Sequence, residues 1–271
     1  MHNLAWKIAL VLRSQASPVL LETYHTERHA AGLFAMDQAF KRWRTRSLLN
    51  HYNAQDEGEE LPDVIVELGS RYNNSAAIMY INGARGAIYE DPFWPTSFPG
   101  SRAPHVWLRG EDTSESSDSK SLYDHFEPGK FSLLCSRSGG NWVECAEELS
   151  DKYPIKTVIV PSEREFLSKY KIHDSGAVIV RPDGIIGWKA QNDAELGLFE
   201  VILKQLLCFT VAEDEMLPSL MTRTRTVPEV DGLMRKMTLS QKTPSRKTAG
   251  PGGLLRRMTT MRTKKKSTSE F

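Results

Sequence analysis

The stretch GAVIVRPDGIIGWKA, residues 176–190, decides the fold. It consists of two apolar runs separated by Pro182-Asp183-Gly184, a combination typical of a tight turn between two antiparallel strands. We therefore predict a β-hairpin. Upstream, FSLLC (131–135) and KTVIV (156–160) are continuous apolar runs, as in strands buried on both faces.

Amphipathic segments alternate with these strands. NWVECAEELSDKY (141–153) and EREFLSKYK (163–171) predict helices that follow the first and second strands, and LGLFEVILKQLLCF (196–209) predicts a closing helix. The order β-α-β-α-β-β-α is that of a thioredoxin-like domain, in which helices cover a sheet. The fold class is therefore α/β, with this domain over residues 129–209.

The N-terminal part predicts two helices and two short strands. NLAWKIALVL (3–12) is amphipathic, with Lys7 and Arg13 facing away from an apolar face made by Leu4, Ile8, Val11 and Leu12. Ser17-Pro18 suits the start of a second helix, whose pattern continues through Phe40 towards Leu48. VIVELG (64–69) and AAIMYI (76–81) are predicted as strands. EDTSESSDSKS (111–121) has the composition of a solvated linker, so we divide the chain into 1–110, a linker 111–128, 129–209 and a tail 210–271.

The tail differs from the rest of the chain in charge. Residues 216–271 contain thirteen Lys/Arg and three Asp/Glu, a net of +10, whereas the preceding 215 residues have a net of −9. We expect 210–271 to be a disordered, solvated extension. Its basic residues before Thr238, Thr248 and Thr259 also suit basophilic kinases or an anionic surface, but nucleic acid is not the expected partner.

The cysteines and the hydropathy indicate a cytoplasmic location. Cys135, Cys145 and Cys208 are an odd number without a CxxC motif, which argues against a disulfide framework and against a thiol peroxidase. No stretch approaches the roughly 20 apolar residues of a membrane span. The periodic N-terminal segment, interrupted by Trp6-Lys7, does not read as a signal peptide.

Several short sequence motifs resemble those of FAD-dependent aromatic hydroxylases of the phenol hydroxylase type. Asn3-Leu4-Ala5-Trp6-Lys7 is similar to the family's Asn-Leu-Ala-Trp-Lys-Leu helix, and Leu20, Leu21, Tyr24, Glu27 and Arg28 to the following Leu-Leu-x-x-Tyr-x-x-Glu-Arg segment. SRYNNS (70–75), PGSRAPHVWL (99–108) and VRPDGIIGW (180–188) resemble three further family motifs. The matches run in family order from residue 3 to about 209, which identifies the chain as a C-terminal portion of such an enzyme.

The resemblance implies a function for the whole family. Its members use FAD, NAD(P)H and O₂ to hydroxylate a phenolic ring, and the thioredoxin-like domain serves homodimer contacts. This sequence has no G-x-G-x-x-G, which holds the pyrophosphate of a dinucleotide. We therefore expect the chain as written, a truncated gene product or a retained fragment, to hold no FAD and to be inactive. The alternative is a non-enzymatic dimerisation or interaction module.

The lost flavin domain also bears on the first helix and on the candidate site. We expect the Leu4, Ile8 and Leu12 side chains to lack partners and the N-terminal region to be poorly ordered or to self-associate. By resemblance, Asn3 at the start of the helix, and Arg102 and His105 in the Pro-Gly loop, are the candidates for cofactor contact. The catalytic residues are unknown. His25 and His29 have the four-residue spacing of the histidines in a zinc-protease motif, but Glu27 stands two positions after His25 instead of directly after it, so no metal site is predicted.

Overall fold

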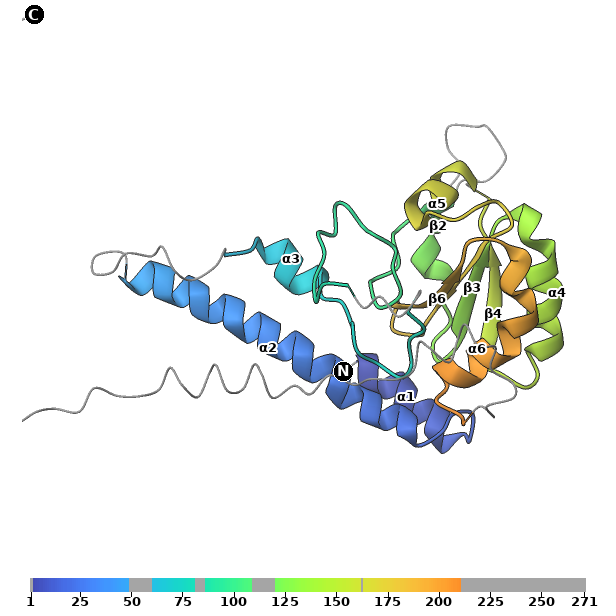
Figure 1. The fold of residues 1–271 in the computed structure, drawn as a ribbon, viewed down its shortest axis with the longest axis horizontal. Coiled ribbons are helices and arrows are strands. Elements are labelled where there is room, and N and C mark those ends of the chain that lie inside the picture. Colours follow the sequence, from blue (N-terminus) through green and yellow to red (C-terminus); the bar gives the residue numbers. More distant parts are fainter. Residues whose placement is uncertain (1, 49–59, 81–85, 109–119, 162, 211–271) are drawn as a thin grey trace, which may run out of the picture. The chain divides into compact units, whose positions relative to one another are not determined.

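The computed structural model describes residues 2–48, 60–80, 86–108, 120–161 and 163–210 (Figure 1). The predicted tail, 210–271, lies outside the described residues except for Thr210, as does most of the acidic stretch 111–121. Residues 120–125, within the predicted linker, form β2 (Lys120–Ser121) and the 3₁₀-helix η3 (Leu122–His125), and Leu122 is buried. Strand β2 pairs with β1 (Trp107–Leu108).

The predicted order of strands and helices over residues 129–209 is confirmed. The elements are β3 (Phe131–Cys135), α4 (Gly140–Leu149), β4 (Ile155–Ile159), α5 (Glu163–Tyr170), β5 (Ala177–Val180), β6 (Ile186–Ala190) and α6 (Phe199–Leu206). The strands lie side by side in the order β4-β3-β5-β6. Strand β3 is parallel to β4 and antiparallel to β5, which pairs with β6 across the predicted hairpin turn.

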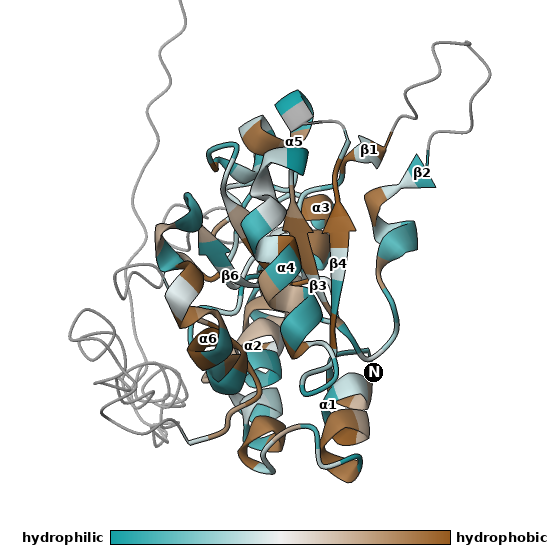
Figure 2. Cartoon of the chain, turned by 90° about the vertical axis from the view of Figure 1, so that its right-hand side faces the viewer, coloured by the Kyte–Doolittle hydropathy of each residue, from teal (hydrophilic) through white to brown (hydrophobic). Residues whose placement is uncertain are grey.

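Alternate residues of the strands supply two hydrophobic clusters, because side chains point to opposite faces of a sheet. Leu133 and Ile179 pack on one face with Trp142 of α4 and Leu203 of α6, whereas Leu134 packs on the other face with the α5 residues. Figure 2 shows hydrophobic residues along β3 and much of β4. Both faces of the sheet are therefore covered, as its continuous apolar strands require.

Two N-terminal helices complete the first of these faces. Helix α1 (His2–Leu12) and the start of α2 (Val19–Leu48) place Trp6, Leu10 and Leu20 in the same cluster as the sheet. The Trp6 ring meets Phe131 edge-on, with ring centroids 5.6 Å apart. The α1–α2 turn is joined to the end of α6 by a hydrogen bond from the Ser17 backbone N–H to the Leu207 carbonyl (3.0 Å).

The prediction that Lys7 faces away from the protein is wrong. Lys7 is completely buried, while 41% of Ile8 and 80% of Leu12 are exposed. The buried face consists of Asn3, Trp6, Lys7 and Leu10, which also follow helical spacing. The expected lack of partners therefore holds for Ile8 and Leu12 but not for α1 as a whole, because its other face packs on the sheet.

The predictions of two strands before residue 82 are also wrong. Residues 64–68 belong to a helix, α3 (Asp63–Leu68), whose cap is Pro62 and whose first turn carries the favourable acidic Asp63. Residues 76–80 form turns and irregular chain, joined to β6 by a hydrogen bond from Met79 N–H to the Gly187 carbonyl (2.9 Å). Here the apolar residues indicate burial and not a strand, because Ala77 and Ile78 are buried without belonging to a strand.

Candidate functional site

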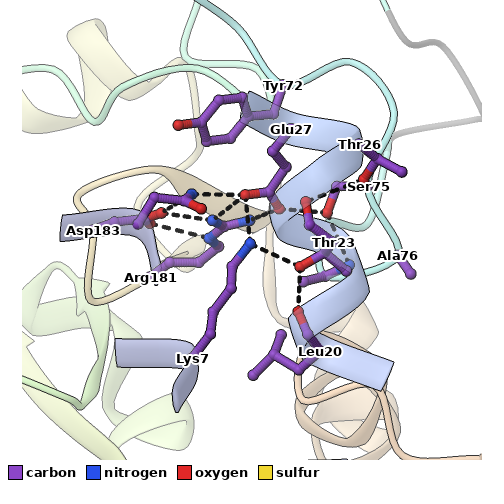
Figure 3. Close-up of polar contacts among 12 residues, drawn as sticks. Lys7, Leu20, Thr23, Thr26, Glu27, Tyr72, Ser75, Ala76, Arg181 and Asp183 are labelled. Atoms are coloured by element: carbon purple, nitrogen blue, oxygen red, sulfur yellow. Dashed lines mark hydrogen bonds and ion pairs between the residues drawn. The ribbon is translucent and has the colours of Figure 1, made fainter. Parts of the chain in front are cut away.

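A buried carboxylate, that of Glu27 on α2, is the centre of a cluster of buried polar residues (Figure 3). Its Oε1 accepts hydrogen bonds from Arg181 (2.7 Å) and the Ser75 hydroxyl (2.6 Å). Its Oε2 accepts from Lys7 (2.7 Å), Asn3 (2.7 Å) and a second nitrogen of Arg181 (2.9 Å). This carboxylate is thus fully hydrogen-bonded inside the protein, as a buried charge must be.

The charges in the cluster balance. Burial by itself would raise the pKa of Glu27, but the charges and hydrogen bonds of Arg181 and Lys7 lower it to about 2. Burial opposes the charge of Arg181, yet Asp183 and Glu27 raise its pKa well above the ordinary value. For Lys7, burial lowers the pKa, and Glu27 opposes this effect. With Asp183, the cluster contains two cations and two carboxylates.

The β5–β6 turn supplies the second carboxylate. Asp183 accepts hydrogen bonds from Arg181, at 3.1 Å from Nε and 2.6 Å from an Nη atom, and from Asn3 Nδ2 at 2.8 Å. Because both hydrogens of the Asn3 amide are donated to carboxylates, its Oδ1 is oriented away from them. That oxygen is buried and has no hydrogen-bond partner among the described residues. The turn therefore fixes the first turn of α1.

The local sequence explains why these groups converge. Asn3 and Lys7 are four residues apart on α1, and so are Thr23 and Glu27 on α2, so each pair lies on one face of its helix. Lys7 Nζ also donates to Thr23 Oγ1 (2.7 Å), which joins the two helices. Figure 3 shows Arg181 and Asp183 reaching this helix pair from the hairpin.

Aromatic rings enclose the guanidinium group of Arg181. It lies over Trp6, at 5.1 Å from the ring centroid, and over Tyr72, at 5.6 Å. Tyr72 in turn accepts a hydrogen bond from Arg28 (3.2 Å), and burial raises its pKa. Glu27 and Arg28 thus both contact residues of neighbouring segments.

Arg102 and His105 lie around a different residue, Tyr123 of η3. The His105 ring stacks on Tyr123, with centroids 5.7 Å apart, and its Nε2 is 2.8 Å from Ser121 Oγ. Burial raises the pKa of Tyr123, while the charge of Arg102 and a hydrogen bond from it act in the opposite direction. The Arg102 segment forms a β-bridge with Ile185. The loop thus flanks the same hairpin turn that holds Asn3.

The sequence did not reveal the partners of Glu27. Lys7 was assigned to the solvent face, and Thr23, Ser75 and Asp183 were not singled out. The available signal was the four-residue spacing of polar groups beside Trp6 and Leu10 on α1. The hairpin's contribution had no local signal, because Arg181 lies 154 positions from Glu27.

Thiol and metal chemistry find no support among the described residues. Burial raises the pKa of Cys135 to about 11 and that of Cys208 to about 12, the opposite of an activated thiolate. His25 and His29 stack at 4.9 Å between ring centroids. In the described part of the chain, no group of three or more His, Cys, Asp or Glu side chains could hold a metal ion. No helix there is long and apolar enough to cross a membrane.

Two family models match the segments that supply the charged residues of the Glu27 cluster. A model for the FAD binding domain matches residues 1–39, and one for the C-terminal part of aromatic-ring hydroxylases matches residues 96–207. Lys7 and Glu27 lie in the first segment, and Arg181 and Asp183 in the second. The cluster therefore joins the two matched segments.

Known proteins of this kind are similar along most of the chain. The chain is 34% identical to 4-methyl-5-nitrocatechol 5-monooxygenase of Burkholderia over 76% of its length, and 28% identical to phenol 2-monooxygenase of Pseudomonas over 74%. It spans 39% and 40% of these relatives. The crystal structure of aklavinone-11 hydroxylase with FAD and aklavinone matches with a TM-score of 0.66 and 30% identity, over 76% of this chain and 38% of that one.

Proposed function

The chain belongs to the FAD-dependent aromatic-ring hydroxylases, and from that premise we propose that it serves as the C-terminal part of an enzyme that hydroxylates a phenolic ring with FAD, NAD(P)H and O₂. The observation that supports this most is the Glu27 cluster. It fixes the helices matched by the FAD-binding model to the hairpin matched by the hydroxylase model. The role of the described residues is to hold α1 in place.

The residues present do not form a cradle for FAD. Asn3 Oδ1 is buried without a partner, but it is a hydrogen-bond acceptor and cannot neutralise a pyrophosphate. Arg102 and His105 contact Tyr123 and Ser121, and the sequence has no G-x-G-x-x-G. We propose accordingly that this chain alone holds no FAD and does not hydroxylate. Asn3, Arg102 and His105 remain proposals as groups near the cofactor.

Two measurements test the proposal. Added FAD should keep its fluorescence in the presence of the purified chain, and a yellow preparation with stoichiometric flavin would contradict this. A chimera that joins the N-terminal part of 4-methyl-5-nitrocatechol 5-monooxygenase to this chain at Asn3 should retain FAD and oxidise NAD(P)H faster when a phenol is added. If the chimera binds FAD but no phenol accelerates this oxidation, the hydroxylase proposal is wrong.

A second candidate function is a thioredoxin-like module that forms a homodimer, in a reducing cytoplasmic setting. The observation in its favour is Ile159 on β4, a strand at the edge of the sheet, whose side chain is 48% exposed. Sedimentation equilibrium should then show a dimer that Ile159→Lys converts to a monomer. A monomer at all concentrations would exclude this candidate.

A further inference from the structure

A cavity separate from the Glu27 cluster lies between the α1–α2 turn and the beginning of β3 and β4. Its volume is about 290 Å³. The lining residues come from three segments: Arg13 and Gln15; Pro128, Gly129 and Lys130; Ser150, Tyr153, Pro154 and Ile155. The first of these segments lies within residues 1–39 and the other two within residues 96–207, the two matched regions that the Glu27 cluster joins.

The charge of the lining is positive. Arg13 and Lys130 line the cavity, and no Asp or Glu does. Glu127 pairs with Lys130 (2.9 Å), but it is shared with Lys156. Among the described residues, Arg13 has no ion-pair partner. The lining therefore carries more positive charge than its surroundings compensate.

The polar groups of the lining differ in whether they have hydrogen-bond donors left for a ligand. The Ser150 hydroxyl donates to the Glu147 carbonyl (2.8 Å), and the Tyr153 hydroxyl donates to Glu200 (2.9 Å). Arg13 lies beside Gly129: a Cβ atom on Gly129 would be 3.7 Å from an Nη atom of Arg13. Its fork of N–H donors matches the geometry of carboxylate and phosphate oxygens.

We propose that this cavity binds a small oxyanion, a phosphate- or carboxylate-bearing molecule, through Arg13 and Lys130. The volume is near the lower limit of small-molecule sites, so the ligand is larger than a water cluster and smaller than a dinucleotide. Because its walls come from the α1–α2 turn and from the sheet, a bound anion stabilises the junction between them. The proposal does not depend on hydroxylase activity.

Titration calorimetry with inorganic phosphate and with citrate, at constant ionic strength, tests it on the full chain. We expect saturable binding of at least one, together with a higher melting temperature; the one that binds more tightly distinguishes phosphate from carboxylate ligands. Arg13→Gln should weaken binding at least tenfold, and Arg13→Lys should restore part of it. Arg164→Gln, an exposed arginine on α5, is the matched control and should bind as the native chain does.

Three outcomes would overturn the proposal. They are the absence of saturable binding of both anions, an unchanged affinity in Arg13→Gln, and an equal loss in Arg164→Gln, which would show non-specific attraction. Circular dichroism of Arg13→Gln should match the native spectrum, because Arg13 is exposed. If that variant is misfolded, Lys130→Gln replaces it, with the same expected loss of affinity.

Discussion

Two sites in the molecule bury cations in opposite ways. Around Glu27, Lys7 and Arg181 are completely buried but share two carboxylates. On β6, Lys189 is 5% exposed, and its ammonium group donates to the Tyr170 carbonyl (3.1 Å) and Ser97 Oγ (3.3 Å), beside the Phe98 ring. Among the described residues it has no carboxylate partner.

Arg181 and Lys189 differ in the direction of the pKa shift, whereas the pKa of Lys7 is lowered like that of Lys189. Burial, with a contribution from the charge of Lys171, lowers the pKa of Lys189 to about 8. Arg181 is buried more deeply, yet its carboxylate neighbours raise its pKa. Burial alone therefore does not decide the direction of a pKa shift, because nearby counter-ions act against it. The cluster should stabilise the fold only when complete, whereas the buried charge of Lys189 should destabilise it.

The largest expected effect follows from removal of the central carboxylate. Glu27→Gln leaves Lys7 and Arg181 buried with less compensation, and we expect the free energy of unfolding to fall by about 3–5 kcal/mol. Urea denaturation followed by circular dichroism measures this. Glu22→Gln, at an exposed position of the same helix, is the control. A change below about 1 kcal/mol would show that the cluster is not what holds α1 to the hairpin.

The second-largest expected effect is the loss of stability when acid protonates Glu27. The pKa of Glu27 is about 2 in the folded protein and 4.5 ordinarily, so its contribution is complete above pH 4.5 and is lost as the pH falls towards 2. The loss amounts to roughly 3 kcal/mol. Unfolding free energies measured from pH 6 to pH 2 should show it, and the Glu27→Gln variant should lack this component.

Exposed Glu127 requires a separate control for the acid experiment. Hydrogen bonds from Lys156 and Lys130 lower its pKa to about 2 as well. Glu127→Gln should leave most of the acid-dependent loss in place, because exposed pairs contribute little. If this variant removes the loss as completely as Glu27→Gln does, the assignment to Glu27 is incorrect.

At Lys189 the buried group destabilises the fold when it is charged, which is the opposite of Glu27. The unfolded chain keeps this proton up to about pH 10.5, whereas the folded chain releases it near pH 8, so stability should rise as the pH increases between these values. Lys189→Met should remove that rise. At pH 7 it should raise the unfolding free energy by about 1 kcal/mol, because the gain from removing the buried charge is larger than the loss of two hydrogen bonds. A destabilised variant would show that the hydrogen bonds outweigh the burial.

The smallest expected effect concerns the exposed face of α1. Leu12→Ser should change the unfolding free energy by less than about 0.5 kcal/mol, because 80% of Leu12 is exposed. Leu10→Ala, on the buried face, is the comparison and should cost about 2–5 kcal/mol. Thermal unfolding of both variants decides it, and equal effects would show that Leu12 is packed as closely as Leu10.

Local sequence predicted correctly the strands that have both an unbroken apolar run and a clear turn signal. In 131–135 and 176–190, unbroken apolar runs and the Pro182-Asp183-Gly184 turn predict a strand and a β-hairpin, which the structure confirms. Residues 64–68 lacked such a constraint, since β-branched residues that favour strands are also compatible with the short helix that begins after Pro62. Short apolar runs cannot separate these cases.

By itself the sequence determined the family resemblance, the strand and helix order of residues 129–209 and the bounds of the two N-terminal helices. Only the tertiary structure decided which face of α1 is buried. Hydropathy assigns a lysine to solvent because a lone buried charge is costly. Lys7 is buried because Glu27 pairs with it while the distant Asp183 offsets the second cation, Arg181, and that compensation exists only when α1, α2 and the hairpin meet.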